Sequence, residues 1–534
     1  MTTLTPYSPA AAEGSDGFAQ LLHAEWTKFR TVRGWVAGIL VAGLLTVGIT
    51  LLNHSQCGFQ PNPSSAVLPC PGVPTGPGGE AVTDSFYFVH QPLPGNGTIT
   101  VRVTSLTGLY NSSSSGGMSA TAPLTGYVPG VRPWAKTGIM IKASTAAGSA
   151  YAAMLVTGDN GVRMQYDYTG DIAGLPGAAT AAAPRWLRLV RSGDTVTGYD
   201  SLDGAHWTRV GSVTLSGLPS TAQAGLFTAS PAYVVYHGSL GSGGEQGGPT
   251  LATGTLDDLT TSWGSGTWAG RTVTGGAQAG SQGGPFNGQY KQANGTFTVS
   301  GSGDIAPNVI SGPDGAGEDP TRAMVSGTFF ALLAMVIVGA MFITAEYRRR
   351  MIRTTFSASP RRGRVLAAKA VVLAGVTFTV GLVGTAIALP LGEAVLRDGG
   401  NWIPPLPALT TARIIVGTAA AMAVAAVLAL AVGAIARRGV AAVSAVIVVI
   451  VLPYLFAILP GLLPTSAENW MLRVFPAAAF AVQQAFPAYH QVLAQYGPDN
   501  GYYPLTWWAG FLVLCAWTAA ALAVAAVLLK RRDA

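Results

Sequence analysis

The fold is decided by one basic stretch, Glu346-Tyr-Arg-Arg-Arg-Met-Ile-Arg-Thr-Thr-Phe-Ser-Ala-Ser-Pro-Arg-Arg-Gly-Arg-Val-Leu-Ala-Ala-Lys369. It holds eight basic residues and one acid in 24 positions, and it follows residues 325–345, which carry no charge. Loops rich in Lys and Arg stay on the cytoplasmic side of a membrane. The stretch therefore predicts a cytoplasmic loop between two spans, in a polytopic membrane protein.

The composition agrees with a membrane protein that also has a soluble part. Hydrophobic residues make up 49% of the chain and charged residues only 10%, whereas an average soluble domain has about 25% charged residues. This excludes an ordinary soluble protein. However, 69 glycines and 34 prolines among 534 residues are too many for membrane helices alone, because these residues mark turns and loops. A turn-rich region outside the membrane is therefore expected.

Six segments are long and apolar enough to cross a bilayer, whose hydrocarbon core of about 30 Å needs about 20 helical residues. They are residues 34–53, 325–345, 370–391, 414–436, 440–463 and 505–529. An even number of spans places both termini on the same side of the membrane.

Positive charges assign that side to the cytoplasm. With both termini inside, sixteen Lys and Arg residues fall in short cytoplasmic segments and four in short outer segments. The inner ones are Lys28, Arg30, Arg33, the eight of the basic stretch, Arg437, Arg438, Lys530, Arg531 and Arg532, and the outer ones are Arg322, Arg397, Arg413 and Arg473. This excess predicts a multi-pass cell-membrane protein whose residues 54–321 are extracytoplasmic.

The outer region has the pattern of antiparallel strands. Ile99, Val101 and Val103 alternate with polar residues, as on a strand with one buried face. Residues 151–156 and 162–168 flank a short Asp-Asn-Gly turn and are typical of a hairpin. Closely spaced strands of this kind predict an all-β sandwich or jelly roll.

Two cysteines, Cys57 and Cys70, lie close together in this outer region. An extracytoplasmic location favours a disulfide between them over two free thiols, and both alternatives stay open. Cys515 lies inside the last span, where we expect it to pack as a small apolar residue.

No constellation of catalytic residues emerges from the outer region. Glycoside hydrolysis needs two carboxyl groups across the scissile bond, but Glu80, Glu245 and Glu318 lie in Gly-rich stretches outside the clear strands. The six histidines of the chain show no metal-ligand spacing. We therefore expect no enzyme activity, no cofactor and no metal site.

Three tryptophans of the outer region, Trp134, Trp186 and Trp207, are candidates for stacking on a ligand such as a sugar. Aromatic side chains of a sandwich more often belong to its core, because they bury a large area. The two interpretations stay open.

The cytoplasmic side offers two amphipathic segments. Ahead of the first span, residues 18–33 have an apolar stripe at helical spacing with basic residues beside it, which predicts a helix on the membrane surface. In the basic stretch, Tyr347, Met351, Ile352 and Phe356 recur on one side of a short helix. Such a helix is a candidate docking site for a partner protein, and the alternative is a basic patch that binds anionic lipid.

Four phrases of the outer region resemble concanavalin A-like domains. They are Asp84-Ser-Phe-Tyr-Phe-Val-His-Gln-Pro-Leu93, Gly97-Thr-Ile-Thr-Val-Arg-Val103, Trp134-Ala-Lys-Thr-Gly-Ile-Met-Ile-Lys142 and Tyr199-Asp-Ser-Leu-Asp-Gly-Ala-His-Trp207. The likeness covers roughly residues 84–230. It implies a sandwich core there, and a domain that binds carbohydrate or another ligand.

Four further phrases closely resemble permease subunits of ABC-2 type transporters from actinobacteria. They are Ala24-Glu-Trp-Thr-Lys-Phe-Arg-Thr-Val-Arg33, Thr344-Ala-Glu-Tyr-Arg348, Ile352-Arg-Thr-Thr355 and Pro360-Arg-Arg-Gly-Arg-Val-Leu-Ala-Ala-Lys369. The likeness covers residues 18–53 and 322–534. It implies that residues 18–33 form the connecting helix and residues 346–359 the coupling helix, which carry ATP-driven motion from a nucleotide-binding subunit to the spans.

The same resemblance assigns roles to particular residues. The residues expected to couple the permease to the ATPase are Glu346, Tyr347, Met351, Ile352, Arg353 and Phe356. The residues expected to act in the connecting helix are Glu25, Trp26, Lys28, Phe29 and Arg30.

The predicted division of the chain follows from these assignments. It comprises a disordered N-terminus (1–17), the connecting helix (18–33), a first span (34–53), the extracytoplasmic sandwich domain with its linkers (54–321), a second span (322–345), the coupling loop (346–365), and four spans (366–534) with an outer loop (464–504). The expected fold class is a six-helix ABC-2 type permease bundle plus an all-β sandwich or jelly roll.

The motor is expected in another protein. A phosphate-binding loop needs Gly-Lys followed by Ser or Thr, and the chain has no Gly-Lys dipeptide. We therefore predict a permease subunit of an ATP-driven exporter that works with a separate ABC ATPase, a second permease copy or paralogue, and membrane lipids, but with no nucleic acid. The alternative is a membrane-anchored extracytoplasmic carbohydrate-binding or sensor protein.

Overall fold

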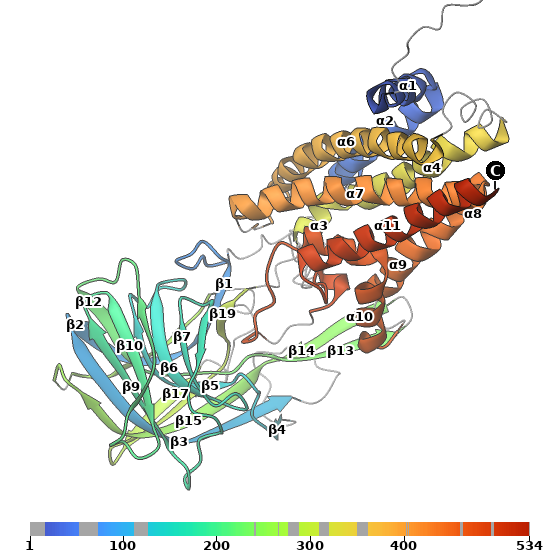
Figure 1. Ribbon diagram of the computed structural model, residues 1–534. Helices are drawn as coiled ribbons and strands as arrows, with labels where there is room; N and C mark the ends of the chain where they lie inside the picture. Colours follow the sequence, from blue (N-terminus) through green and yellow to red (C-terminus); the bar gives the residue numbers. More distant parts are fainter. Residues whose placement is uncertain are drawn as a thin grey trace, which may run out of the picture.

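The computed structural model describes residues 17–52, 73–111, 127–239, 242–264, 266–275, 288–308, 320–349, 361–401, 403, 405–459, 463–492 and 496–532. It consists of a bundle of apolar helices and an antiparallel β-sandwich, which Figure 1 shows as two adjacent bodies. The sandwich is inserted between α2 (Arg33–Leu52) and α3 (Pro320–Val325). The predicted fold class, a six-helix bundle with an all-β domain, is confirmed.

Within the described residues, six helices are long and apolar enough to cross a membrane. They are α2, α3 continued by α4 (Gly327–Arg348), α6 (Arg362–Asp398), α7 (Ala408–Ala436), the run of α8 (Gly439–Val446), η3 (Ile447–Val451) and α9 (Leu452–Ile458), and α11 (Trp507–Arg532). The shorter helices are α1 (Phe18–Thr31), α10 (Thr465–Val474), η4 (Pro476–Gln483) and η5 (Pro498–Asn500). The chain is therefore a multi-pass membrane protein.

The two ends of the bundle differ. We call the end that faces the β-sandwich the sandwich end, and the opposite end, where α1 lies, the α1 end (Figure 1). Helices α7 and α11 begin at the sandwich end and finish at the α1 end, whereas α6 runs the other way.

A proline shapes the fifth span. The π-helical turn η3 directly precedes α9, in which Pro453 stands near the N-terminus. Proline has no N–H to donate to the carbonyl group four residues earlier. A wider turn at this point lets the helix continue past the missing bond.

Glycines allow the helices of the bundle to approach closely. A Cβ atom added to Gly339 of α4 would lie 2.4 Å from the carbonyl oxygen of Ala426 in α7. Small residues bring membrane helices into van der Waals contact where the lipid offers no hydrophobic driving force. The close approach of α4 and α7 therefore depends on the absence of a side chain at Gly339.

The sandwich is built from two antiparallel sheets. One has the strand order β11-β10-β9-β3-β15-β18-β17, with β4 paired to β3, and the other has the order β16-β2-β12-β5-β6-β7-β8. The strands are β2 (Phe86–Pro94), β3 (Gly97–Asn111), β4 (Tyr127–Pro129), β5 (Lys136–Lys142), β6 (Tyr151–Thr157), β7 (Val162–Tyr166), β8 (Gly170–Ala173), β9 (Arg185–Ser192), β10 (Thr195–Ser201), β11 (Thr208–Thr214), β12 (Thr221–Ala229), β15 (Thr250–Thr261), β16 (Ala269–Val273), β17 (Gln289–Ala293) and β18 (Thr296–Gly301). A separate ribbon, β13 (Tyr233–Ser239) and β14 (Ser242–Gly248), projects from the sandwich (Figure 1).

The described sandwich extends past residue 230, where the resemblance to concanavalin A-like domains ends. Strand β15 lies in the middle of the first sheet, between β3 and β18. Its pairing with β3 shifts register near Leu256 and again before Thr260. Such bulges interrupt the two-residue alternation by which a strand is found in a sequence, so this strand gives a weak signal.

The central strands of the second sheet are buried on both faces. One face packs against the first sheet around residues such as Val101, Ile139 and Leu226, and every position of β5 and β6 is buried. The opposite face carries a second core with Phe86 and Phe227, which is covered by β1 (Val82–Asp84) and β19 (Ile305–Pro307).

The inserted region begins and ends at the same place. Strands β1 and β19 pair antiparallel, with Asp84 opposite Ile305. On the side of the bundle, the Thr50 hydroxyl donates a hydrogen bond of 2.9 Å to the carbonyl oxygen of Met324. Helices α2 and α3, which flank the insertion, are therefore adjacent as well.

Two buried lysines of β5 fasten this base to the sandwich. Lys142 Nζ lies 2.8 Å from Asp84 Oδ2, and Lys136 Nζ lies 2.8 Å from Asp304 Oδ1. Burial lowers the pKa of Lys142, and the charge and hydrogen bond of Asp84 act against that shift. Removing one partner would leave an uncompensated buried charge. These pairs therefore hold the two ends of the inserted region in place.

We expect Gly339→Ala to lower the stability of the bundle, because the new methyl group would overlap the Ala426 carbonyl oxygen. Overpacking of this kind costs about 1–3 kcal/mol. The measurement is the Tm of the full-length protein in detergent.

Gly375 of α6 is the matched control, because a Cβ atom there would meet no described atom within 4 Å. Gly375→Ala should leave the Tm unchanged or raise it slightly, since alanine is the better helix former. Equal losses at both positions would rule out close packing at Gly339 as the cause.

Candidate functional site

The α1 end of the bundle holds a buried cluster of charges, and α1 supplies half of it. This helix begins after Gly17, which serves as its N-cap, and its last turn carries Lys28 and Arg30, where basic residues complement the helix dipole. Its buried residues are Glu25 and Phe29. These are four positions apart and so lie on the same face of the helix.

Lys369 lies at the centre of the cluster. Its Nζ is 2.7 Å from Glu25 Oε2 and 2.7 Å from Glu346 Oε1. Lys28 Nζ lies 2.9 Å from Glu25 Oε1 and 3.4 Å from Glu346 Oε1. We call Glu25, Lys28, Glu346 and Lys369 the junction network, because it joins α1, the C-terminal turn of α4 and the first turns of α6.

Three of the four members of the junction network are buried, and its charges balance. Glu25 and Glu346 are each 2% exposed and Lys369 is 1% exposed, while the Lys28 side chain reaches the surface. Burial acts against the charged form of Lys28, but hydrogen bonds and charges from Glu25 and Glu346 outweigh it, so the pKa of Lys28 is raised. Two carboxylates and two ammonium groups thus compensate each other inside the protein.

An aromatic cluster supports the network from the membrane side. Phe342 of α4 meets Phe29 edge to face at 5.5 Å and Trp35 of α2 at 4.9 Å between ring centroids. Lys369 Nζ also lies 4.8 Å from the centroid of the Phe342 ring, within the range of a cation–π interaction. The aromatic cluster therefore adds α2 to the helices that meet here.

The structure places the sequence-predicted coupling residues in different surroundings. Glu346 is buried in the junction network, and the Tyr347 ring lies 5.3 Å from the guanidinium carbon of Arg437. The remaining four, Met351, Ile352, Arg353 and Phe356, lie outside the described residues.

The residues predicted for the connecting helix divide between two faces of α1. Glu25 and Phe29 point into the bundle, while Arg30 and Trp26 are exposed, Trp26 by 43%. An exposed tryptophan with a basic neighbour suits the headgroup level of a membrane. The inward face makes the junction, and Trp26 and Arg30 stand on the outward face.

Sequence reasoning missed the role of Lys369. It was counted only as one of the basic residues of the loop, although it follows the apolar residues 365–368. A lysine two turns into an apolar helix needs a carboxylate partner. Glu25 and Glu346 are the single acids of two otherwise basic segments, and this complementarity was the available signal.

The sandwich and the bundle are joined by a polar contact that is separate from the junction network. Gln491, which precedes α11 in the chain, is buried, and its Nε2 donates hydrogen bonds of 3.2 and 3.3 Å to the carbonyl oxygens of Tyr168 and Thr169. Beside it, the Trp134 ring meets His490 edge to face at 5.3 Å. Tyr168 also donates to Asp84, so this contact reaches the base of the sandwich.

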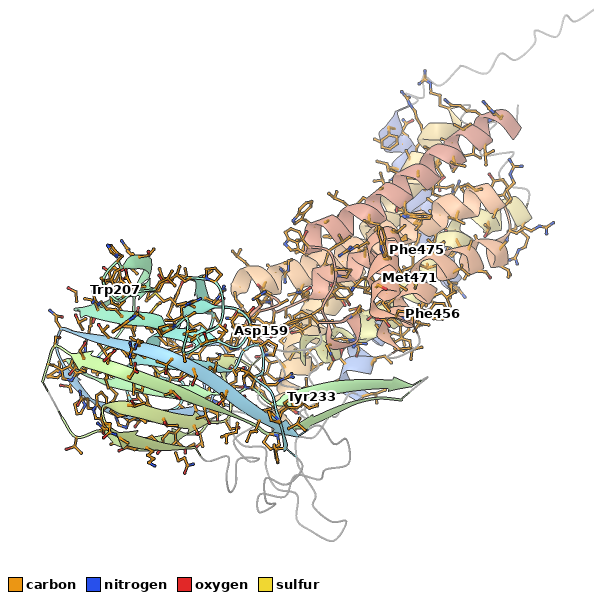
Figure 2. All side chains as sticks on the ribbon, turned by 90° about the horizontal axis from the view of Figure 1, so that it is seen from below. Asp159, Trp207, Tyr233, Phe456, Met471 and Phe475 are labelled. Carbon is orange, nitrogen blue, oxygen red and sulfur yellow. The ribbon has the colours of Figure 1, made fainter. Side chains whose placement is uncertain are left out.

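Two of the three tryptophans proposed for ligand stacking, Trp134 and Trp207, lie in different parts of the sandwich. Trp134 is 3% exposed and packs against His490, where the sandwich meets the bundle. Trp207 lies at the edge of the sandwich remote from the helices (Figure 2), with the Arg188 guanidinium 3.7 Å from its ring centroid. Arg102 lies 5.5 Å from the Trp186 ring. Arg163 lies 5.7 Å from the centroid of the Trp134 ring. Arginine thus covers a face of all three rings, and a ligand-binding role stays a prediction.

Two other sequence-based expectations concern metals and the disulfide. Among the described residues, no group of three or more His, Cys, Asp or Glu side chains could hold a metal ion. Cys57 and Cys70 lie outside the described residues. Cys515 of α11 is a free cysteine.

The six membrane-capable helices among the described residues define an integral membrane protein. The model of the family described as ABC-2 family transporter protein matches residues 218–534, more than half of the chain. The chain belongs to this family.

Comparisons with individual proteins add little to this. No curated protein matches the chain. Among solved structures, the chain is similar to a functionally unknown protein from Saccharomyces cerevisiae, with 16% identity, 34% of this chain and 77% of that chain covered, and a TM-score of 0.20.

A scytalido-glutamic peptidase bound to a transition-state analogue inhibitor has 10% identity, 41% and 98% coverage of the two chains, and a TM-score of 0.23. Sheep galectin-11 with glycerol has 9% identity, with 32% of this chain and 95% of that chain covered, and a TM-score of 0.16. Scores this low carry no argument about function.

We expect Lys369→Met to destabilise the bundle, because it leaves Glu25 and Glu346 facing each other without the ammonium group between them. Removing one member of a buried charge cluster costs about 3–5 kcal/mol. The loss is measured as a lower Tm of the full-length protein.

The double variant Glu25→Gln, Lys369→Met should recover part of this loss, because Lys28 and Glu346 are then left as a pair. Lys530→Met is the control, since Lys530 is an exposed lysine at the same end of the bundle. If the double variant is as unstable as the sum of its single changes, the junction network is not a coupled unit.

Proposed function

We propose that this chain is the permease subunit of an ATP-driven exporter, and that the α1 end receives the motion of a separate ABC ATPase. The junction network is the observation that carries the proposal. A force applied to α1 or to the loop after α4 acts on Glu25 or Glu346, and both are bonded to Lys369 of α6. Because separating these charges inside the protein is costly, the three helices respond together.

The role of Glu346 is positional in this proposal. Since the side chain is buried, it cannot be the surface that a partner touches. It orients the segment that follows α4, where Met351, Ile352, Arg353 and Phe356 are the candidate contacts. In the described part of the chain, Glu346 Oε2 is buried and has no hydrogen-bond partner.

The assembly and orientation are parts of the same proposal. The α1 end faces the cytoplasm, because it gathers the basic segments of the chain, and the sandwich is extracytoplasmic. A second permease copy or paralogue and two ATPases complete the transporter. The family match supports this reading, as ABC-2 permeases work with ATPase subunits.

The sandwich is proposed to bind a carbohydrate or another ligand outside the cell. The contact of Gln491 with Tyr168 and Thr169 favours a connected domain over a passive appendage, because a change in the sandwich reaches the segment before α11. The second candidate function, a membrane-anchored carbohydrate-binding or sensor protein, rests on the same contact and needs no ATPase.

We expect an ABC ATPase to co-purify with the full-length protein in mild detergent from cells that express its neighbouring genes. Glu346→Gln should lower the permease-dependent ATPase rate about tenfold, the scale of a typical coupling free energy between sites. The rate is measured on the purified complex and compared with that of the ATPase alone.

Glu393→Gln is the matched control, because Glu393 is a partly exposed carboxylate at the sandwich end, paired with Arg397 of the same helix. It should leave the rate unchanged. Purification without any nucleotide-binding subunit would favour the anchored sensor protein instead.

A further inference from the structure

The sandwich end of the bundle contains two adjoining cavities that the coupling mechanism does not use. They have volumes of about 630 and 460 Å³ and lie between α7, η4 and the first turn of α11. Thr410, Arg413 and Trp507 line both of them. Together they form one site of the size that small ligands and lipid segments occupy.

The two cavities differ in chemistry. The larger one is apolar, with Val416 and Ala420 of α7 facing Val482 and Phe511. The smaller one has polar groups along its wall, among them Gln484 and Thr506. The site is therefore amphipathic, with an oily compartment and a polar compartment that meet at Arg413.

Arg413 carries the positive charge of this site. Its Nη2 donates a hydrogen bond to the main-chain carbonyl oxygen of Gln484. Among the described residues, its Nε has no acceptor, and the residues that line the two cavities include no carboxylate. Because Nε is enclosed by the protein, only the terminal nitrogens of the guanidinium group can face the cavity. A guanidinium group with no carboxylate among the residues that line its cavity is suited to an oxyanion such as phosphate.

The backbone adds to the positive potential. Helix α7 begins at Ala408 after Pro407, whose side chain cannot cap it. The N–H groups of the first helical turn carry a partial positive charge. The N–H groups of this turn and the Arg413 side chain one turn later therefore both contribute positive potential to the polar compartment.

The surrounding residues place Arg413 at the level of lipid headgroups. Trp507 and Trp508 open α11 and are 46% and 54% exposed, as in the aromatic belts at membrane interfaces. Leu409 and Val416, on the same side of α7, are 86% and 48% exposed, so the site opens toward the hydrocarbon. An occupant with an apolar tail and a charged head would span this boundary.

We propose that this site binds an anionic membrane lipid, with its phosphate on Arg413 and part of an acyl chain in the apolar cavity. A lipid with net negative charge fits better than a zwitterionic one, because a choline or ammonium group would find no carboxylate among the lining residues. The site is independent of the junction network and of any ATPase, since it lies at the other end of the bundle.

The test is native mass spectrometry of the full-length protein in detergent, titrated with phosphatidylglycerol, with phosphatidylcholine or with inorganic phosphate. Phosphatidylglycerol should be retained more strongly than phosphatidylcholine. Arg413→Gln should lower its retention about tenfold, the usual loss when a charge-assisted contact is removed. Arg413→Lys should keep part of the retention, because it keeps the charge.

Two further variants separate this site from general effects. Arg473→Gln removes an exposed arginine of α10 at the same end and should leave lipid retention unchanged. Ala420→Phe fills the apolar cavity without touching the charge, and it should also lower retention, which keeps the proposal testable even if Arg413→Gln fails to fold.

Several outcomes would overturn the proposal. Equal lipid retention by the wild type, Arg413→Gln and Ala420→Phe would show that the lipid binds elsewhere. Displacement of the lipid by inorganic phosphate at millimolar concentration would mean that only the anion is recognised. A change in the monomer–dimer ratio without a change in lipid retention would assign this surface to a second copy of the chain.

Discussion

The rest of the bundle depends on the position of one ammonium group. Lys369 is buried between two carboxylates that come from other helices, at 2.7 Å from each. A charge removed from water costs several kcal/mol unless it is compensated. Lys369 can therefore stay in the bundle only while α1 and α4 keep Glu25 and Glu346 beside it. The three helices form one mechanical unit for this reason.

The two ends of the bundle are built on opposite principles. At the α1 end, charges are paired with each other and enclosed by the rings of Phe29, Trp35 and Phe342. At the sandwich end, Arg413 is bonded to a backbone carbonyl oxygen beside open cavities. An end with paired charges resists deformation, whereas cavities that are lined by a cation and by no carboxylate leave space beside the helices.

Much of the fold was predictable because it depends on local composition. Six apolar stretches predicted six helices, and alternation such as that of Ile99, Val101 and Val103 predicted a sandwich. The junction network was not predictable in this way, since Glu25 and Lys369 are separated by 344 positions. Sequence shows that both charges need partners, but only the packing of α1 against α6 shows that they are each other's. Likewise, Trp134 was a candidate for stacking on a ligand because of its residue type. Its burial against His490 could not be predicted, because His490 lies hundreds of residues away in the chain.

The paired strands at the base of the sandwich also bear on how the chain folds. An insertion between two helices normally imposes a loop-closure entropy that rises with its length, by about 0.6 kcal/mol for each doubling. Thr50 and Met324, which are in contact, are 274 positions apart. Because β1 and β19 pair with each other, the folded sandwich brings its own ends together. Once it has formed, the remaining connection between α2 and α3 behaves as a short one. The sandwich can therefore vary in size without separating the helices from which it extends.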